Sequence, residues 1–406
     1  MSVESTPWGE SQSAVVPGIS APSSVACLRS LGKRGIRTIA ASSDETTPAF
    51  SSRYCDEAVL VPSPHDDLVA YKDALLSLAM RPDVQTIIPV REEDVYVLAR
   101  YREEFEEHVS TLWPEFDTLA DVQDRIRLFE AAENAGVGVP ETRLLDDDEI
   151  DWEREQEWIV KARYSILGDG YVDCEPESCV APPSTRYLPP GATPDIDSIS
   201  AEMGHVPIVQ EFMPTTDEYG FFALYDHGEP LATFQHRQRR GWSYAGGPSA
   251  FRESVRIPDL EESGLSLLDE LDWHGLAMIE FLRDEETGEF KLMEINPRFW
   301  SSLPFSVRAG ADFPYYYWLL ATDNTDRIDH EYRANIGGHL LRGELLYLHS
   351  VLTDEVDLVE PPAFSDALSD VAESLWEHPR FDYLQRDDVR PFFRDMRNTY
   401  GAFRDQ

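Results

Sequence analysis

The chain has 406 residues, of which 42% are hydrophobic, so it is long enough for roughly two to three domains and apolar enough to bury a sizeable core. It carries 76 Asp and Glu against 35 Lys and Arg, a formal net charge of −41, which argues against binding to nucleic acid or to an anionic membrane surface. Only Lys33, Lys72, Lys161 and Lys291 are lysines, and so acidic and lysine-poor a composition is typical of halophilic proteins, in which high salt screens the self-repulsion.

Cysteine usage and the apolar runs exclude further classes. The cysteines, Cys27, Cys55, Cys174 and Cys179, form no C-x-x-C pair, which argues against a thiolate zinc site and, at this length, against a disulfide framework. No basic segment followed by an apolar run opens the sequence, so we expect no signal peptide. The longest apolar run, 315–321, is too short to span a bilayer. We therefore expect a cytoplasmic protein that does not enter a membrane.

The first part of the chain, after an expected flexible tail at 1–12, alternates short apolar runs with amphipathic stretches. Strands are predicted at 14–16, 38–41, 58–61 and 86–90, and helices at 23–34, 68–80 and 92–107. This alternation predicts a parallel, doubly wound, Rossmann-like sheet over about 13–118. The first strand-to-helix turn, 16–20, has one glycine where a dinucleotide-binding turn needs G-x-G-x-x-G, so we expect neither a nicotinamide nor a flavin cofactor.

The remainder of the chain has a different pattern. A helix is predicted at 121–135, and residues 173–200, rich in Pro, Ser and acids, are expected to form a surface loop. Strands are predicted at 208–212, 219–225, 231–236, 277–281 and 290–295. The turns expected at 226–228 and 286–288 indicate antiparallel pairing. Residues 323–406 are acidic and aromatic and have no predicted role.

The densest group of chemically useful residues lies in the last two of these strands. A hairpin at 284–289 would bring Glu280 and Glu294 onto neighbouring strands, with Asn296 on the same face as Glu294 because strand side chains alternate. Two carboxylates and an amide suit a hard cation such as Mg²⁺, which completes its shell with phosphate oxygens and water. Arg298, the next residue on that face, would repel the metal unless an anion such as phosphate lay between them.

A second group surrounds Lys161. This lysine ends an apolar strand, 158–161, where it can act as a point charge on phosphate oxygens. A loop with Gly168 and Gly170 follows, and glycines let backbone N–H groups approach an anion. The loop is short and contains Asp169, an acid that is unfavourable beside phosphate groups. Whether the loop closes over phosphates is therefore left undecided. The alternative is a lysine at a strand edge that reaches into solvent.

Two weaker signals follow along the chain. An extended backbone at 210–214 could give the donor and acceptor that read an adenine edge, and Glu218 could bind ribose hydroxyls; the alternative is an edge strand with a polar turn. Arg237, Arg239 and Arg240 cluster in a very acidic chain. They could bind a carboxylate or phosphate substrate, or they could pair with the surrounding acids.

Taken together, these motifs resemble those of the ATP-grasp superfamily, particularly ligases similar to the carbamoyl-phosphate synthase large subunit and biotin carboxylase, over about residues 13–322. The resemblance implies a fold of class α/β and α+β. It has a Rossmann-like domain at 13–118 and a two-subdomain ATP-grasp domain at 119–322, whose smaller lid subdomain spans about 150–210. Residues 323–406 are left as a C-terminal region.

The resemblance also assigns roles residue by residue. It implies that Glu280, Glu294 and Asn296 bind Mg²⁺ or Mn²⁺, and that Lys161 and Arg125 contact the phosphates of ATP. The adenine hinge and the ribose ligand would be Glu211, Phe212, Met213 and Glu218. Arg298 would neutralise the transferred phosphoryl group or the substrate carboxylate.

The implied activity is ligation of a small-molecule carboxylate, activated by ATP as an acyl phosphate, to an amine or similar nucleophile. Arg237, Arg240 and Arg298 are the residues expected to bind the substrate. Two alternatives stay open on the same scaffold: a phosphotransferase that acts on a non-carboxylate acceptor, and a nucleotide-binding regulatory protein without turnover. The sequence identifies neither the carboxylate nor the acceptor, nor the oligomeric state.

Overall fold

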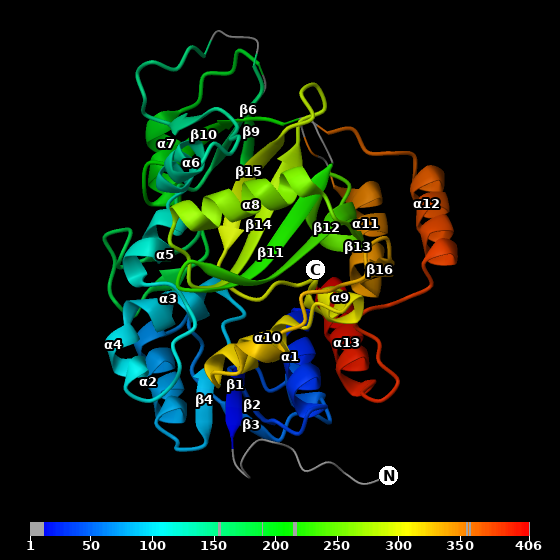
Figure 1. Cartoon of the computed structure of the whole chain (residues 1–406). Coiled ribbons are helices and arrows are strands. Elements are labelled where there is room, and N and C mark those ends of the chain that lie inside the picture. Colours follow the sequence, from blue (N-terminus) through cyan, green and yellow to red (C-terminus); the bar gives the residue numbers. More distant parts are fainter. Residues whose placement is uncertain are drawn as a thin grey trace.

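The computed structural model of the chain describes residues 12–152, 156–188, 190–213, 217–354, 356 and 359–405, the last four without their side chains. All but one residue of the predicted tail, 1–12, lie outside this range. Figure 1 shows the larger sheets stacked along the molecule: a parallel sheet at the bottom, a large antiparallel sheet in the centre and a smaller sheet at the top. The C-terminal helices lie along one side.

The amino-terminal layer is the predicted doubly wound sheet. Its strands are β1 (Ser13–Pro17), β2 (Arg37–Ser42), β3 (Glu57–Leu60) and β4 (Val84–Ile87), all parallel and in the order β3-β2-β1-β4. Its helices are α1 (Pro22–Gly32), η1 (Pro48–Ser51), α2 (Leu68–Ala79), α3 (Glu92–Arg100) and α4 (Arg102–Glu106). The single helix predicted at 92–107 is wrong, since the chain leaves helical geometry at Tyr101, where ψ is 30°.

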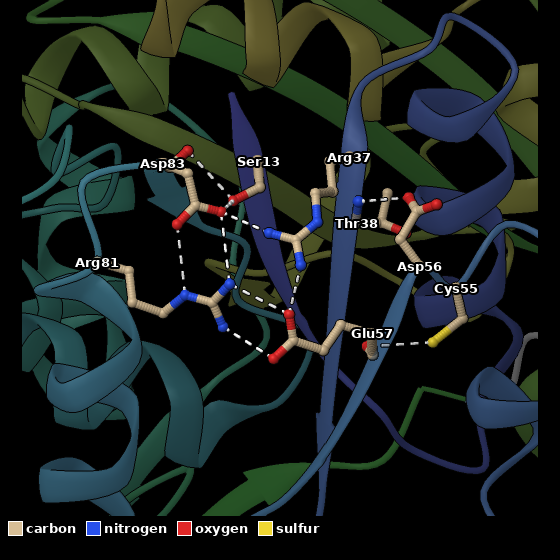
Figure 2. Close-up of polar contacts among 8 residues, drawn as sticks. All are labelled: Ser13, Arg37, Thr38, Cys55, Asp56, Glu57, Arg81 and Asp83. Carbon is tan, nitrogen blue, oxygen red and sulfur yellow. Dashed lines mark hydrogen bonds and ion pairs between the residues drawn. The ribbon is translucent and has the colours of Figure 1, made fainter. Parts of the chain in front are cut away.

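A network of ion pairs joins the strands of this layer at their amino-terminal edge (Figure 2). Arg37 pairs with Glu57 at 2.6 Å and with Asp83 at 2.7 Å, and Arg81 pairs with Glu57 at 2.9 Å. Ser13 donates to Asp83 at 2.9 Å. Since ligands of open α/β sheets bind at the carboxyl ends of the strands, the network occupies the edge that binding does not need.

The smaller sheet is antiparallel, in the order β5 (Thr142–Leu144), β10 (Ile208–Glu211), β6 (Trp158–Lys161), β9 (Arg186–Leu188). A two-stranded ribbon, β7 (Leu167–Gly168) and β8 (Cys179–Val180), lies beside it, and α7 (Ile196–Met203) completes the segment. The surface loop predicted at 173–200 is therefore wrong in part, because backbone pairing to β6 overrides its Pro-rich composition.

Two helices replace the one predicted at 121–135. They are α5 (Phe116–Gln123) and α6 (Arg125–Asn134), separated by Asp124, whose backbone is extended. The Asp124 carboxylate accepts a hydrogen bond from the N–H of Ile126 and forms an ion pair of 2.6 Å with Arg163. An Asp in this position starts a new helix more readily than it continues the old one.

The central sheet carries the most chemistry. Its order is β15 (Phe290–Asn296), β14 (Gly275–Arg283), β11 (Glu218–Asp226), β12 (Glu229–Ser243), β13 (Gly246–Ser254) and β16 (Gly337–His339), all antiparallel, as predicted for the strands from 208 onward. Both faces are buried, because Phe221 and Ala223 of β11 belong to one core while Phe222 and Leu224 belong to another. Helix α8 (Pro258–Glu270) packs into the first core.

The C-terminal region completes the second core and adds β16 to the edge of the central sheet. Helices α9 (Leu303–Ala309) and α10 (Phe313–Ala321) precede this region and pack in the same core. The helices of the region itself are η2 (Thr325–Arg327), α11 (Leu341–Thr353), α12 (Phe364–Glu377) and α13 (Arg390–Asp405). Among the described residues, no helix combines the length and the apolar character that crossing a membrane would require. The domain boundaries given above stay predictions.

Buried ion pairs fasten this region to the rest of the chain. Arg29 of α1 binds Asp388 at 2.9 Å, and Arg252 of β13 binds Asp382 at 3.1 Å; all four side chains are at most 2% exposed. Arg240 binds Glu344 of α11 at 2.8 Å. Because buried charges must be compensated, these pairs fix where the C-terminal region docks.

Asp388→Ala is expected to lower the free energy of unfolding by about 3–5 kcal/mol, because it leaves the Arg29 guanidinium buried without its counter-charge. Asp387→Ala is the matched control. Asp387 pairs with Lys33 at 3.3 Å at the surface, so we expect a loss below about 1 kcal/mol. Urea unfolding of both variants in molar KCl measures the difference. Equal losses of unfolding free energy would contradict the role of the Arg29–Asp388 pair in docking the C-terminal region.

Candidate active site

Two carboxylates face each other on the central sheet. Glu280 of β14 and Glu294 of β15 are direct partners in the antiparallel register, and the Asn296 amide nitrogen lies 3.1 Å from Glu294 Oε1 and 3.4 Å from Glu280 Oε1. Alternation along β14 places Glu280 on the same face as Leu276 and Met278. The structure thus brings together the three predicted metal ligands.

Two arginines anchor this cluster from either side. Arg125, the first residue of α6, donates to Glu294 Oε2 and to the Ala162 carbonyl, both at 3.0 Å. Arg298 donates to Asn296 Oδ1 at 2.7 Å and to Glu92 Oε1 at 2.7 Å. Both arginines contact the cluster; Arg298 lines the adjacent cavity, whereas Arg125 is not among the described residues that line it, and the roles implied for them stay predictions.

The structure adds a residue that the sequence did not single out. Glu92, the first residue of α3, joins the amino-terminal layer to the cluster through Arg298, and its second oxygen accepts from Gln123 at 2.9 Å. Gln123 in turn accepts from the Tyr171 hydroxyl at 2.7 Å. An acid at the start of a helix is stabilised by the helix dipole and needs no further explanation. For this reason nothing in the sequence pattern marked Glu92 as part of a site.

A cavity of about 800 Å³ lies against this cluster. Glu280, Glu294, Arg298 and Lys161 line one part of it. The loops at the carboxyl ends of β1 and β4 line another part, and His236, Gln238 and Trp242 of β12 contribute to the wall as well. The cavity therefore lies where the parallel layer meets the central sheet.

The two carboxylates have opposite electrostatic environments. Burial, together with the Glu294 charge, raises the pKa of Glu280 to about 8. Burial acts on Glu294 too, but the Arg125 guanidinium and the Asn296 amide hold its pKa below the usual value. One carboxylate is thus compensated and the other is not, which is the arrangement that a divalent cation with oxygen ligands would relieve.

Lys161 ends β6, as predicted, and lines the cavity. Burial lowers the pKa of its ammonium group to about 7, and the nearby Arg125 charge lowers it further, against the opposing effect of Glu294 and Glu280. A lysine that carries little charge when alone gains charge when an anion enters. Its position suits a phosphate contact.

The structure separates the residue predicted to bind ribose from those predicted to bind adenine. Glu218 lines the cavity, accepts from Gln238, and has its pKa raised to about 7 by burial. Glu211, Phe212 and Met213 are not among the described residues that line it. The N–H groups of Glu211 and Phe212 donate to the carbonyls of Glu141 and Glu157, so the adenine hinge stays a prediction.

The loop of Gly168 and Gly170 docks on α3. The Tyr96 hydroxyl donates to Asp169 at 2.7 Å and accepts from the N–H of Gly170 at 2.9 Å, and Arg100 pairs with Asp169 at 3.2 Å. A Cβ at Gly168 would lie 2.8 Å from the Tyr96 ring. Close packing against an aromatic side chain is therefore one reason for glycine there, and closure over phosphates stays untested.

Arg237 and Arg240 do not line the cavity. Arg237 pairs with Asp217 at 2.6 Å, and Arg240 packs against α11 through Glu344. The geometry of both arginines therefore agrees with the alternative, in which they pair with the surrounding acids. The β12 residues that do reach the cavity are His236, Gln238 and Trp242. Strand alternation separates them from Arg237, but Arg240 has their parity, and the register of β12 shifts on either side of it.

Comparison with known proteins bears on the fold. Residues 16–112 match the family model described as PylC-like, N-terminal domain. No curated protein sequence matches the chain. Among solved structures, it is similar to the biotin carboxylase domain of 2-oxoglutarate carboxylase from Hydrogenobacter thermophilus, a dimer with ADP, MgADP and bicarbonate, at 16% identity over 81% of this chain and 74% of that one, with a TM-score of 0.59.

Two further solved structures are similar to the chain. N5-carboxyaminoimidazole synthetase from Staphylococcus aureus with ADP matches at 14% identity over 82% of each chain, with a TM-score of 0.59. The chain has the ATP-grasp fold. Pyruvate carboxylase from Rhizobium etli matches at 17% identity and a TM-score of 0.58 over 80% of this chain, which spans 29% of that longer protein. The ATP-grasp resemblance and the predicted fold class are confirmed.

Glu280→Gln is expected to make the metal-free protein more stable at pH 8, by about 1–3 kcal/mol. The native-state pKa of Glu280 is about 8 and the unfolded-state value is about 4.3, so the unfolded chain loses this proton first. The contribution of Glu280 to the free energy of unfolding therefore falls as pH rises from about 4.3 to 8.

Urea unfolding in EDTA between pH 5 and pH 8 measures this effect. The two proteins should be closest at pH 5 and should diverge as pH rises. Glu286→Gln, in the exposed turn of the same hairpin, is the matched control and should follow wild type. A constant difference across this pH range would contradict the assignment.

Proposed function

We propose that the chain is an ATP- and Mg²⁺-dependent ligase that activates a carboxylate as an acyl phosphate and joins it to an amine or similar nucleophile. The observation that carries the proposal is the convergence of Glu280, Glu294, Lys161 and Arg298 at one cavity of the ATP-grasp fold, with Asn296 in contact with both carboxylates and with Arg298. The nucleotides in two similar structures, MgADP in one and ADP in the other, support ATP and Mg²⁺ as cofactors.

In this proposal Glu280, Glu294 and Asn296 would hold Mg²⁺, which supplies neutralisation of charge on the phosphate oxygens when bound. The Asn296 amide oxygen now accepts from Arg298. An amide that ligates a cation would have to turn its oxygen toward the carboxylates, and Arg298 would then be free to bind an anion.

Lys161 is the proposed phosphate contact, whereas Arg125, for which the resemblance implied the same role, is not among the described residues that line the cavity. Lys161 reaches the cavity from β6, and Arg125 lies behind Glu294, where it keeps that carboxylate ionised. A lysine whose charge grows as the phosphates arrive favours the state with the most negative charge. Glu218 is proposed for the ribose hydroxyls, and 211–213 for the adenine edge.

Arg298 is the residue proposed to orient the reacting carboxylate. Glu92 still holds its guanidinium after the Asn296 oxygen has turned to the cation, so Arg298 does not have to be ordered when the substrate binds. A substrate carboxylate oxygen attacks the γ-phosphorus and ADP leaves. The nucleophile then attacks the acyl carbon, phosphate leaves, and the amine loses its proton.

The acyl phosphate hydrolyses if water reaches it, so the site needs a cover. The loop of Gly168 and Gly170 is the proposed cover. Its attachment to Tyr96 and Arg100 places it against the amino-terminal layer beside the cavity wall formed by Ser165 and Ile166.

The rest of the cavity is proposed to take the substrates. His236 is buried, burial lowers its pKa to about 3, and its Nδ1 has no hydrogen-bond partner within the described part of the chain. The Trp242 indole N–H lacks one there as well. These neutral groups and the aromatic surface favour an uncharged or aromatic portion of a substrate over a second anion.

Hydroxylamine trapping tests the reaction type. With MgATP, hydroxylamine and a panel of carboxylates in molar KCl, we expect hydroxamate and ADP to form in equal amounts with the correct carboxylate. Glu294→Gln should lower this rate on the order of 10²–10³-fold, because it removes a carboxylate of the cation site. Glu286→Gln should behave as wild type. Normal turnover by Glu294→Gln, or phosphate transfer to a hydroxyl acceptor without hydroxamate, would contradict the proposal.

Nucleotide affinity is expected to fall as pH rises above 7. Without nucleotide the pKa of Lys161 is about 7, and bound phosphates raise it, so binding above pH 7 takes up a proton. Affinity should drop by up to about tenfold per pH unit until the pKa of the bound state is reached.

Calorimetric titration with ADP in EDTA, in two buffers of different ionisation enthalpy, measures this uptake at pH 8. Lys161→Arg keeps a positive charge at all these pH values and should abolish the uptake. An unchanged uptake in Lys161→Arg would assign the proton to another group.

A further inference from the structure

A second cluster of ligand-type side chains lies at the other end of the central sheet. Asp226 ends β11, His227 follows it in the turn to β12, and His274 precedes β14; one ligand atom of each lies within 4.8 Å of the others. Asp226 and Glu218 are at opposite ends of β11, which at about 3.4 Å per residue separates this cluster from the cavity by roughly 25 Å. The cluster is therefore no part of the site described above.

The orientation of His274 is fixed by its surroundings. Its Nε2 lies 3.1 Å from the Thr111 carbonyl, which can only accept, so Nε2 carries the proton and Nδ1 has the lone pair. Nδ1 lies 3.7 Å from Asp226 Oδ1 and 3.2 Å from the N–H of His227. A carbonyl that fixes the tautomer and aims the other nitrogen at a carboxylate is the usual support of a metal-binding histidine.

The turn brings the second imidazole to the first. His227 and Gly228 have φ values of 46° and 81°, as a two-residue hairpin turn of type I′ requires. The His227 ring lies 4.0 Å from the His274 ring, centroid to centroid, at 42°. His227 is exposed and His274 is half-buried, so an ion can enter from solvent.

The surroundings of His274 keep its imidazole neutral, the form that can act as a metal ligand. Burial, with a further contribution from His227, lowers the pKa of His274 to about 4, against the effects of Thr111 and Asp226; Arg102 acts in the same direction as His227. His274 is therefore neutral at pH 7, and a metal ion has no proton to displace from it.

We propose that Asp226, His227 and His274 bind a divalent transition-metal ion, with Zn²⁺ as the best match. Two imidazoles and one carboxylate suit Zn²⁺ and not Mg²⁺, which prefers oxygen ligands. Water would complete a tetrahedral shell. The hydrogen bond from His227 N–H to Nδ1 is long, and the ion would replace it.

The position of the site indicates what the ion would do. Thr111, which orients His274, lies in the segment between α4 and α5, and a Cβ at Gly275 would come within 2.6 Å of the neighbouring Leu112 carbonyl. The tip of the β11–β12 hairpin and the start of β14 therefore meet the amino-terminal layer here. Zn²⁺ would fasten the hairpin tip to this junction and stabilise the folded chain.

Zn²⁺ titration of the EDTA-treated full chain in molar KCl tests the site. We expect wild type to bind one Zn²⁺ through this cluster and its Tm to rise by at least about 3 °C at saturation. His227→Asn, which keeps a residue that tolerates positive φ, and Asp226→Asn should each weaken this binding by about 10²-fold or more. His330→Asn, at an exposed histidine elsewhere, is the matched control and should bind as wild type does.

The Glu294→Gln variant separates this site from the proposed ligase. It should still bind Zn²⁺ through the cluster and show the Tm rise, whatever becomes of its ATP turnover. Circular dichroism and the Tm without metal check that each variant folds. The proposal is overturned if wild type binds no Zn²⁺ at micromolar concentrations, or if His227→Asn and Asp226→Asn bind it as tightly as wild type.

Discussion

The pairing of two buried carboxyl groups, Glu280 and Glu294, is the constraint on which the centre of the molecule depends. Antiparallel pairing of β14 and β15 sets them opposite each other at the cavity. Such a pair is tolerated only if one carboxyl group keeps its proton or if cations compensate the charge. Burial and the Glu294 charge raise the pKa of Glu280, and positive charge comes from helix α6, from the end of β6 and from the chain after β15, through Arg125, Lys161 and Arg298. Elements distant in sequence thus meet around these two carboxyl groups.

Compensation by arginine recurs across the structure and differs in strength with burial. The network of Arg37 and Arg81 at the amino-terminal edge of the parallel sheet is partly exposed, with side chains 28–40% accessible, so high salt screens it. The pairs of Arg29 with Asp388 and of Arg252 with Asp382 are buried, so salt screens them much less. In a chain predicted to be halophilic, the buried pairs are the ionic contacts that keep their strength, and they are the ones that dock the C-terminal region.

The sequence predicted what depends on local pattern and on strand alternation. The doubly wound layer, the antiparallel strands and the hairpin that pairs Glu280 with Glu294 follow from apolar periodicity and turn residues. Breaks at Tyr101 and Asp124 were missed, since both lie inside continuous amphipathic patterns and depend on tertiary contacts such as the pair of Asp124 with Arg163. Glu92 was missed because its role requires Arg298, more than 200 residues away. Arg240 looked available for substrate only because its partner Glu344 belongs to a region whose fold could not be predicted.

Helix α3 links the chemistry of the site to the packing of its cover. Its first residue, Glu92, holds Arg298, while Tyr96 and Arg100, further along the helix, hold the loop of Gly168 and Gly170. A shift of α3 relative to the central sheet would therefore move the arginine and the loop together. Since Asp94 fixes the start of the helix by accepting from the N–H groups of Val90 and Arg91, that shift would have to involve the whole amino-terminal layer.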